Sequence, residues 1–286
     1  MKQWKIRLLA AVILLVGVGL VGYPVVSNIM FEKRQEALAN FYESTVAEIS
    51  EEERSSHWED CDNYNRALAR EASAISDPFT SDLDPNTLPY AALLNLGGDG
   101  VMGTIDIPGV AGRLVIYHGT GEDVLQNGVG HLQGTSLPVG GTGTHCVLSA
   151  HCGLPSKKLF TNLDQLEKGE VFFLHIMGET LAYKVDNIAV VLPHETEGIL
   201  IDPEQDYVTL VTCTPYGINS HRLLVRGIRV TYEEAKQIES VQHKKKGSTW
   251  QQQYIRAILI GLGIAFVSAL AIVLIRRRRM KNKREQ

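Results

Sequence analysis

Two long apolar runs lie near the two ends of this chain and constrain everything between them. The first extends from Leu8 to about Phe31, and the second, Ala257–Ile275, contains no charged residue. Each is long enough to cross the apolar core of a bilayer as a helix, which takes about 20 residues. The intervening residues 32–256 must therefore fold as a domain tethered to a membrane at both ends.

Basic residues lie outside the two runs and predict the orientation of the chain. Lys2, Lys5 and Arg7 precede the first run. The residues that follow the second run include Arg276, Arg277, Arg278, Arg279, Lys281, Lys283 and Arg284. Basic residues flanking membrane helices favour the cytoplasmic side, so we expect both termini in the cytoplasm and the central domain outside the cell membrane.

The central part of the chain is acidic, although the formal net charge of the whole is only −4. Removing the ten flanking bases from 28, and Glu285 from the 32 acidic residues, leaves 18 basic against 31 acidic residues, about 13 negative charges. Such a balance argues against a nucleic-acid partner and suits a domain that stays off anionic lipid.

A cleaved signal peptide is the alternative reading of the first apolar run, because Ala37-Leu38-Ala39 has the small-x-small form of a cleavage site. Glu32, Lys33, Arg34 and Glu36 separate that triplet from the apolar run, whereas cleavage sites normally follow the apolar region closely. We therefore predict an uncleaved anchor.

The composition changes several times along the chain. Residues Glu32–Ile75 are rich in Ala, Glu, Arg and Leu, lack Gly and Pro, and predict one or two amphipathic helices. Pro78, Pro85 and Pro89 then predict a loop. The predicted segments are residues 1–31 (basic start and anchor), 32–75 (helical), 76–100 (loop), 101–246 (β domain), 247–275 (juxtamembrane segment and second membrane helix) and 276–286 (basic tail).

Short alternating runs separated by Gly, Pro and Asp occupy the β domain and predict about eight strands, with one helical insert near Lys157–Leu166. A mainly β domain of this kind is a barrel or a sandwich. The predicted strands are Met102–Ile107, Leu114–Tyr117, Thr144–Ser149, Val171–Ile176, Leu181–Val185, Ile188–Leu192, Tyr207–Cys213 and Leu223–Val230.

Four cysteines in an exported domain raise the question of a disulfide or a metal site. If the segment containing Cys146 and Cys152 is extended at about 3.3 Å per residue, their Cα atoms lie about 20 Å apart, whereas a disulfide needs about 4.4–6.8 Å. The same spacing opposes a zinc site built from His145-Cys146 and His151-Cys152, unless the chain reverses there. We predict no metal or cofactor, and we interpret Cys61 as a buried helical residue.

Cys213 ends an alternating run that begins at Tyr207, where the chain turns through Thr214–Gly217. An antiparallel return along Ser220–Val225 would bring Arg222 opposite the thiol. A neighbouring cation stabilises a thiolate, and the thiolate is the nucleophilic form of cysteine. The arrangement predicts acyl-transfer chemistry, with a small core thiol as the alternative reading.

Three segments together resemble the sortases, and more closely their class C, pilin-polymerising branch. Thr209–Cys213 matches the pattern Thr-Leu-x-Thr-Cys that ends in the nucleophile of that family, and Arg222 follows at the family's spacing. Leu148–Pro155 is similar to the family's histidine segment, with Cys152 in place of the more usual arginine. Asp77-Pro78-Phe79 resembles the lid of pilin sortases, although Asp-Pro is also ordinary turn chemistry.

The resemblance implies a closed β-barrel of about eight strands with short helices, preceded by a helical segment and flanked by two transmembrane helices. It also implies a substrate: a Leu-Pro-x-Thr-Gly-like sorting signal on secreted pilin proteins, which act as donor and acceptor. Cleavage after the threonine would leave a thioester, which a lysine amine of a neighbouring pilin would resolve into an isopeptide bond. We expect the catalytic domain to act as a monomer without a cofactor.

The chain contains nine histidines, so the acid–base residue must be chosen among them. The resemblance favours His151, because the family's motif surrounds it and the turn Gly153-Leu154-Pro155 would leave it near a groove. The rivals are His145, His175, His194 and His221, the last of which adjoins Arg222.

The roles implied by the resemblance are specific. Cys213 would attack the peptide carbonyl, His151 would protonate the departing amine and later accept a proton from the incoming one, and Arg222 would hold the substrate and stabilise the oxyanion. In the implied lid, Phe79 would cover Cys213 and Asp77 would engage Arg222. Two alternatives remain: a housekeeping sortase that anchors surface proteins to the cell wall, and a non-catalytic membrane-tethered ectodomain.

Overall fold

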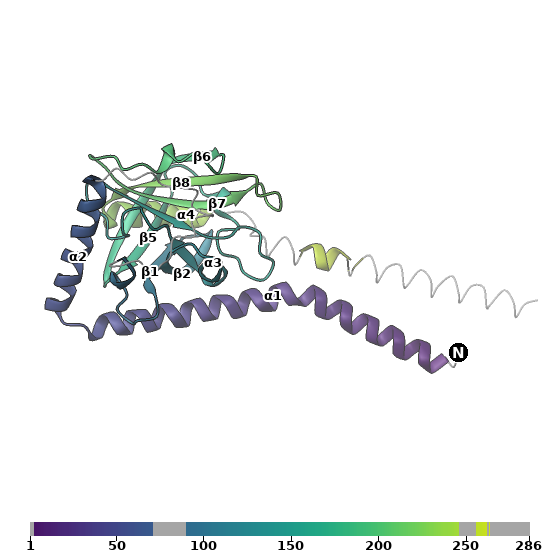
Figure 1. The fold of residues 1–286 in the computed structure, drawn as a ribbon. Helices are drawn as coiled ribbons and strands as arrows, with labels where there is room; N and C mark the ends of the chain where they lie inside the picture. Colours follow the sequence, from purple (N-terminus) through teal and green to yellow (C-terminus); the bar gives the residue numbers. More distant parts are fainter. Residues whose placement is uncertain (1–2, 71–89, 246–255, 262, 264–286) are drawn as a thin grey trace, which may run out of the picture. The chain divides into compact units, whose positions relative to one another are not determined.

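The computed structural model describes residues 3–70, 90–245, 256–261 and 263 (Figure 1). The chain divides into two units, one made of residues 1–23 and 247–286 and the other of residues 24–246. The second unit contains the β domain with its helices. The predicted lid, Asp77-Pro78-Phe79, and most of the second apolar run lie outside the described residues.

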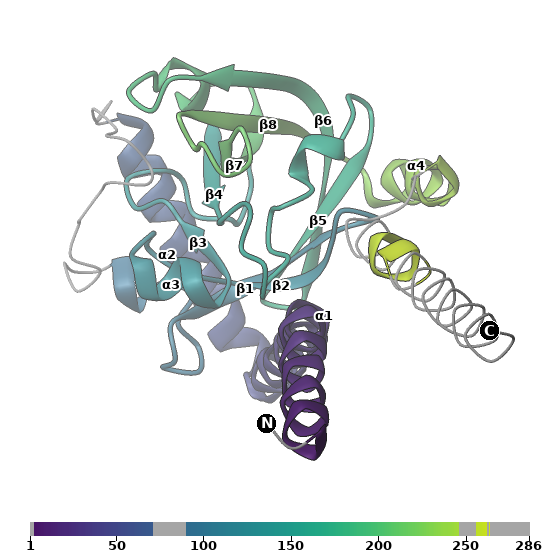
Figure 2. The same cartoon turned by 90° about the vertical axis from the view of Figure 1, so that its right-hand side faces the viewer.

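Eight strands form a closed barrel in the order β1-β2-β3-β4-β7-β8-β6-β5 (Figures 1 and 2). The β2–β3 and β4–β7 pairs are parallel, and the others are antiparallel. The strands are β1 (Val101–Ile107), β2 (Ala111–His118), β3 (Val129–His131), β4 (Thr144–Ser149), β5 (Val171–Ile176), β6 (Glu179–Val191), β7 (Asp206–Thr214) and β8 (His221–Val230). The barrel prediction is confirmed, and the sandwich is excluded.

Three details of the sequence prediction are wrong. The two strands predicted at Leu181–Val185 and Ile188–Leu192 are one strand, β6, with an irregularity between Val185 and Asn187. Strand β3 was not predicted, because three residues are too short to show an alternation. The helical insert at Lys157–Leu166 is a series of turns with only a short 3₁₀ segment, Leu163–Gln165.

The alternation of side chains along each strand separates a packed interior from an outer face. On β7, Val208 and Leu210 belong to the main core with Leu148 and Val225. Neighbouring residues on a strand point to opposite faces. The odd-numbered residues of β7, with Cys213 among them, therefore lie on the outer face of the barrel wall.

Two helices precede the barrel: α1 (Gln3–Glu48) and α2 (Glu51–Arg70), separated by a capped turn in which Ser50 and Glu53 exchange hydrogen bonds. The buried positions of α1 recur every three or four residues and form one stripe facing the barrel. They are Asn28, Phe31, Gln35, Ala39, Tyr42 and Val46. The amphipathic pattern predicted for this region is confirmed, and Cys61 of α2 is fully buried.

The stripe on α1 is anchored by hydrogen bonds to the barrel. Gln35 accepts from the backbone N–H of Val115 and donates to the carbonyl of Asn127. Further along the helix, the Tyr42 hydroxyl donates to the carbonyl of Met102 and accepts from the N–H of Met177. The helix therefore crosses the outside of β2 and β1 and reaches the β5–β6 turn.

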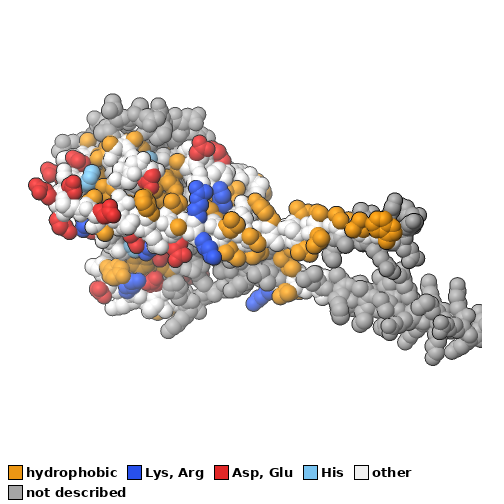
Figure 3. Space-filling model, turned by 90° about the horizontal axis from the view of Figure 1, so that it is seen from below, with side chains coloured by type: hydrophobic (Ala, Val, Ile, Leu, Met, Phe, Trp, Pro, Cys, Tyr) orange, Lys and Arg blue, Asp and Glu red, His pale blue; other side chains and the backbone are white. Residues whose placement is uncertain are grey.

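Among the described residues, one helix is long and apolar enough to cross a membrane, and it is α1. Its segment Leu15–Glu48 contains a window of mean hydropathy 1.4 that is only 11% buried. Exposed apolar side chains follow the helix from Trp4 to Met30, and Figure 3 shows orange side chains gathered along it. An anchor and a signal sequence share these properties. The second predicted membrane helix stays a prediction.

The remaining elements are short. They are α3 (Glu122–Asn127) between β2 and β3, α4 (Tyr232–Lys245) after β8, and the 3₁₀ segments η1 (Tyr90–Ala92), η2 (Leu163–Gln165) and η3 (Glu197–Ile199). Helix α4 packs through Ala235 on Val171 and Phe173 of β5. The β6–β7 connection contains η3, which lies beside the site described next.

Candidate active site

The ends of β4, β7 and β8 bring the predicted site residues together. Cys213 of β7 is the direct register partner of Arg222 of β8, as the alternation predicts. Ser149, the last residue of the parallel strand β4, is level with Val211. Two further residues along each chain bring His151 level with Cys213. Paired residues of a sheet share a face, so the thiol and the guanidinium lie on the outer face at one end of the barrel, with the imidazole beside them.

A buried hydroxyl joins the two strands immediately before the site. Thr212 is 2% exposed, and its Oγ1 donates to the carbonyl of Ala150 over 2.7 Å. The N–H of Ala150 donates in turn to the carbonyl of Val211. The residues directly before His151 and Cys213 are thus tied to each other. This role of Thr212 does not follow from the sequence, because a hydroxyl in an alternating strand gives no sign of its partner.

The guanidinium of Arg222 is almost enclosed, with 9% of the residue exposed. Its Nη1 donates to the carbonyls of Asn219 and His221, each over 3.3 Å. The turn that carries Asn219 is closed by hydrogen bonds from the N–H groups of Ile218 and Asn219 to the carbonyl of Pro215. The β7–β8 turn therefore holds a fixed positive charge beside the thiol.

The imidazole of His151 is more open, with 24% of its side chain exposed. Its Nε2 lies 3.7 Å from Oε2 of Glu122 at the start of α3 and has no hydrogen-bond partner among the described residues. Glu122 is a neighbour that the sequence analysis missed, since nothing in the sequence links residues 122 and 151. An imidazole nitrogen that lies near a carboxylate and makes no hydrogen bond is available for proton transfer.

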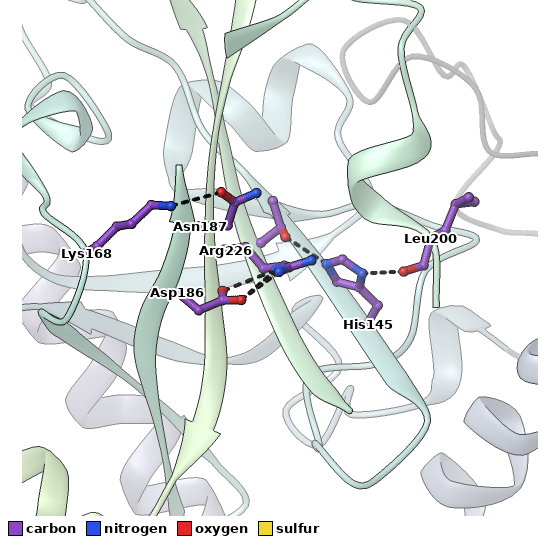
Figure 4. A network of polar contacts seen from close by, with 7 residues as sticks. His145, Lys168, Asp186, Asn187, Leu200 and Arg226 are labelled. Carbon is purple, nitrogen blue, oxygen red and sulfur yellow. Dashed lines mark hydrogen bonds and ion pairs between the residues drawn. The ribbon is translucent and has the colours of Figure 1, made fainter. Parts of the chain in front are cut away.

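His145, the rival on the same face of β4, is a structural residue (Figure 4). Its Nδ1 lies 2.7 Å from the carbonyl of Leu200, and its Nε2 lies 2.7 Å from Oγ1 of Thr209. A carbonyl can only accept, so Nδ1 carries the proton and Nε2 accepts from the threonine. Burial lowers the pKa of His145 to about 4. Both of its nitrogens are occupied, and the ring is neutral at physiological pH.

The polar network around His145 continues across the outer face to β8 and β6. Arg226 donates to both carboxylate oxygens of Asp186, the shortest distance being 2.6 Å, and its guanidinium lies 4.1 Å from the centre of the Tyr207 ring. The pairs Thr209–Arg226 and His145–Tyr207 are register partners. The network therefore fixes the part of this face that is farthest from Cys213.

The other rival histidines lie away from the thiol or face away from it. His175 of β5 lies 3.0 Å from the hydroxyl of Thr180, and burial lowers its pKa. His194 is exposed in the β6–β7 connection. His221 is the register partner of Thr214, so it lies on the face opposite to that of Cys213.

The other cysteines differ from Cys213 in their surroundings. Burial raises the pKa of Cys61 to about 12 and that of Cys146 well above its usual value. The pKa of the half-buried Cys152 is raised to about 11, first by burial and then by Asp164 and Cys213. None of the four cysteines, all of which are described residues, forms a disulfide. Cys152 is held as the neutral thiol, which makes it a poor nucleophile.

Apolar side chains fill the outer face between the polar network and Cys213. Ile199 of η3 packs there on Val147, Val211 and Leu224, together with Leu132. A separate pocket of about 830 Å³ lies at the other end of β4, where Thr144 and the glycine-rich loop 140–143 face α2. That pocket is remote from the thiol, so the chemistry is assigned to the strand ends and not to the pocket.

Comparison with known proteins agrees with this geometry. The sortase domain family matches residues 105–230, from β1 to the end of β8. Sortase C1 of GBS Pilus Island 1 superimposes with a TM-score of 0.63 at 43% identity, covering 69% of this chain and 93% of that one. Sortase C of Streptococcus pneumoniae gives a TM-score of 0.62 at 43% identity, covering 68% and 97%.

The chain belongs to the sortase family. Sortase A of Streptococcus agalactiae serotype III is 34% identical over 117 residues, which are 40% of this chain and 47% of that relative. The chain thus spans about half the length of this curated relative, in contrast to its nearly complete coverage of the two solved sortases C. The members of the family are cysteine transpeptidases.

Within this sortase, the three residues predicted for catalysis come from three different strands or strand ends. Only Cys213 and Arg222 could be placed opposite each other from local alternation. The position of His151 depends on the parallel β4–β7 pairing, which joins segments that lie 62 residues apart. The family motif therefore identified a residue that the pattern of the strands could not.

Proposed function

We propose that this sortase is a membrane-anchored cysteine transpeptidase that assembles pilin subunits. The single observation that carries the proposal is the register of β4, β7 and β8, in which Cys213 opposes Arg222, and the last β4–β7 pair, Ser149 and Val211, lies two residues before His151 and Cys213. A thiol, an imidazole and a fixed guanidinium on one face are the groups that acyl transfer requires.

The first half of the reaction forms the acyl-enzyme. The thiolate of Cys213 attacks the threonine carbonyl of a Leu-Pro-x-Thr-Gly-like signal, and a C–S bond forms as the oxygen becomes negatively charged. The C–N bond to glycine then breaks, and protonated His151 gives its proton to the departing amine. The product is a thioester on Cys213.

The second half joins two proteins. The amine of a lysine on a neighbouring pilin attacks the thioester, and neutral His151 accepts the proton that the amine loses. The C–N bond of an isopeptide forms and the C–S bond breaks, which regenerates the thiolate of Cys213 and leaves His151 protonated, as at the start of the first half. Arg222, fixed by the β7–β8 turn, stabilises the negative oxygen in both halves, where single donors in other enzymes contribute about 2.7–4 kcal/mol.

The pilin assignment is supported by the solved relatives. The GBS sortase C1 is that of Pilus Island 1, and the structure of the Streptococcus pneumoniae sortase C bears on pilin substrate specificity. The apolar α1 supports anchoring at a membrane, where secreted substrates pass. We further propose that Asp77-Pro78-Phe79 closes the groove over Cys213 until substrate arrives.

Mass spectrometry of the full chain in detergent tests the mechanism. Wild type and Cys213→Ala are incubated with a Leu-Pro-x-Thr-Gly peptide, alone and with the lid substitutions Asp77→Ala and Phe79→Ala. We expect a thioester adduct in wild type that forms faster without the lid residues and is absent from Cys213→Ala. No adduct even in the lid variant would contradict the acyl-transfer proposal and support a non-catalytic ectodomain.

The acceptor is tested separately. The same reaction is supplied with either a lysine-containing pilin domain or a glycine-based amine that represents a cell-wall precursor. We expect the isopeptide product with the pilin domain and little product with the second amine. The reverse preference would replace pilus assembly with the anchoring of proteins to the cell wall.

A further inference from the structure

The loop that follows His151 rests on the N-terminal helix. Oγ of Ser27 donates to the carbonyl of Ser156 over 3.2 Å, and Nδ2 of Asn28 donates to the carbonyl of Pro155 over 2.8 Å. The Phe31 ring, one turn further along α1, is 8% exposed and belongs to the main core. Residues 27–31 of α1, about one and a half turns, thus support the loop from one side, and this surface is the floor of the loop.

Asn28 is the most enclosed polar contact in this floor. The residue is 2% exposed, and its Nδ2 also donates to the carbonyl of Pro24 over 2.7 Å. Both N–H bonds of the amide are therefore used, one within α1 and one across to the loop. Loss of the amide would remove this part-buried hydrogen bond to the Pro155 carbonyl, and with it the polar contact that ties this point of the loop to α1.

Hydrogen bonds connect the loop that contains Pro155 to His151 and to the elements around it. The N–H of Phe160 donates to the carbonyl of His151 over 3.2 Å, so the loop closes on the catalytic residue itself. The N–H of Gly153 donates to Oγ1 of Thr161 over 3.1 Å, and Nζ of Lys157 donates to the carbonyl of Gln126 at α3. Helix α1 supplies the remaining side of this support.

Gly153 shows how little room the loop has to adjust. Its φ of +86° is one that residues with a side chain rarely adopt, and an added Cβ would lie 3.1 Å from the Tyr216 ring of the β7–β8 turn. The loop is thus held between the turn beside Cys213 and the floor on α1.

We propose that Asn28 is a positioning residue for His151, acting through the Pro155 carbonyl. The inference rests on the proposed function for its kinetic consequence, but the contact itself does not. Because Asn28 lies near the end of the first apolar run, that end of the predicted anchor is a structural part of the active site and more than a tether.

The test compares Asn28→Ala with Tyr42→Phe in the full chain, reconstituted in lipid nanodiscs. Tyr42 is a suitable control because its hydroxyl makes two hydrogen bonds between α1 and the barrel, 14 residues further along the helix, whereas Asn28 makes one to the loop and one within α1. Displacing a catalytic group slightly lowers the rate of chemistry more than substrate binding. We expect kcat for peptide cleavage to fall about tenfold in Asn28→Ala with KM within about twofold, and both constants to stay within about twofold in Tyr42→Phe.

Hydrogen exchange gives a readout that does not require activity. Amide exchange in the peptide spanning residues 152–161 should accelerate in Asn28→Ala and remain unchanged in Tyr42→Phe. Equal kcat and equal exchange in wild type and Asn28→Ala would overturn the proposal, as would an effect confined to KM. If wild type forms no adduct, the proposed function fails, yet the exchange comparison still decides whether Asn28 holds the loop.

A milder variant covers failure of Asn28→Ala to fold. Ser27→Ala removes only the contact to the Ser156 carbonyl from a half-buried side chain. It should accelerate exchange in the same peptide and lower kcat about threefold, in the same direction as Asn28→Ala. Wild-type exchange and wild-type kcat in Ser27→Ala, in the absence of a folded Asn28→Ala, would overturn the proposal.

Discussion

The two threonines of Thr209–Cys213 occupy opposite faces of β7 and have different partners. Thr209 donates to His145 on the outer face, while Thr212 donates to the Ala150 carbonyl. Each fixes β7 to β4, Thr209 within the shared ladder and Thr212 just beyond its last pair. The motif therefore specifies how the strand is held as well as which thiol reacts.

Removal of the Thr212 hydroxyl should loosen the site. Thr212→Val keeps the shape but leaves the Ala150 carbonyl without its donor, which costs about 1–3 kcal/mol of stability for a buried group. We expect a lower midpoint of thermal unfolding and slower thioester formation. Thr212→Ser retains the hydroxyl and serves as the control. An unchanged melting curve for Thr212→Val would show that the hydrogen bond is not needed.

The carboxylate beside His151 should contribute little. Glu122 is exposed over 72% of its side chain, and ion pairs in contact with water are worth about 0.2–1 kcal/mol. Glu122→Gln should change kcat/KM for the sorting peptide by less than about fivefold. A loss of two orders of magnitude would instead make Glu122 an essential partner of the imidazole.

At the scale of elements, the sequence predicts strands correctly where apolar and polar residues alternate. Where they do not alternate, the prediction from the sequence is wrong. The polar pair Asp186-Asn187 predicts a break between two strands, but it lies inside β6, where Asp186 forms an ion pair with Arg226. The apolar spacing of Leu159, Phe160 and Leu163 resembles a helix. That segment instead directs its Phe160 N–H to the carbonyl of His151, so its backbone is satisfied by the strand end and not within itself.

Shortening the side chain of Ile199 should weaken the packing of the β6–β7 connection on the barrel. Ile199 is 2% exposed among Val147, Val211 and Leu224. Ile199→Ala should lower the free energy of unfolding by about 2–4 kcal/mol, whereas Ile199→Val should cost only about 0.5–1.5 kcal/mol. Urea denaturation measures both. Equal stability of the two variants would mean that the connection closes over the cavity.

At the scale of the whole molecule, the sequence predicts the parts better than their arrangement. The acidic charge of the central domain and its mainly β core follow from composition and alternation. The parallel β4–β7 pairing and the packing of α1 on β1 and β2 depend on contacts between segments that are distant in the sequence. Gln35 and Asn28 illustrate this, because a buried amide on a helix has no partner that can be read from its neighbours.

The stability of the folded domain should rise with pH between about 4 and 6.5. Burial lowers the pKa of His131 and of His145 to about 4 each, below the value of 6.5 in an unfolded chain. The unfolded chain binds more protons in this window, so acid favours unfolding. The loss approaches about 3 kcal/mol per histidine at pH 4 and is absent above pH 7.

Denaturant midpoints of the full chain between pH 4 and pH 8 measure this dependence. The raised pKa of buried Asp206 acts in the opposite direction at the acid end. The Arg226 charge near His145 adds to the histidine effect. His145→Gln should flatten the slope by about half. A stability that does not change between pH 5 and pH 7 would contradict the prediction.

The closure of the barrel has a consequence for how a peptide is recognised. Each of the eight described strands has a hydrogen-bonded neighbour on both sides over part of its length. In the register of the described strands, Lys184 is the last residue of β6 that pairs with β5, and Asn187–Val191 pair with β8 alone. Backbone pairing with a sorting signal is therefore confined to such short uncovered stretches, and elsewhere the peptide must be recognised by side chains on the barrel wall and by the loops around it.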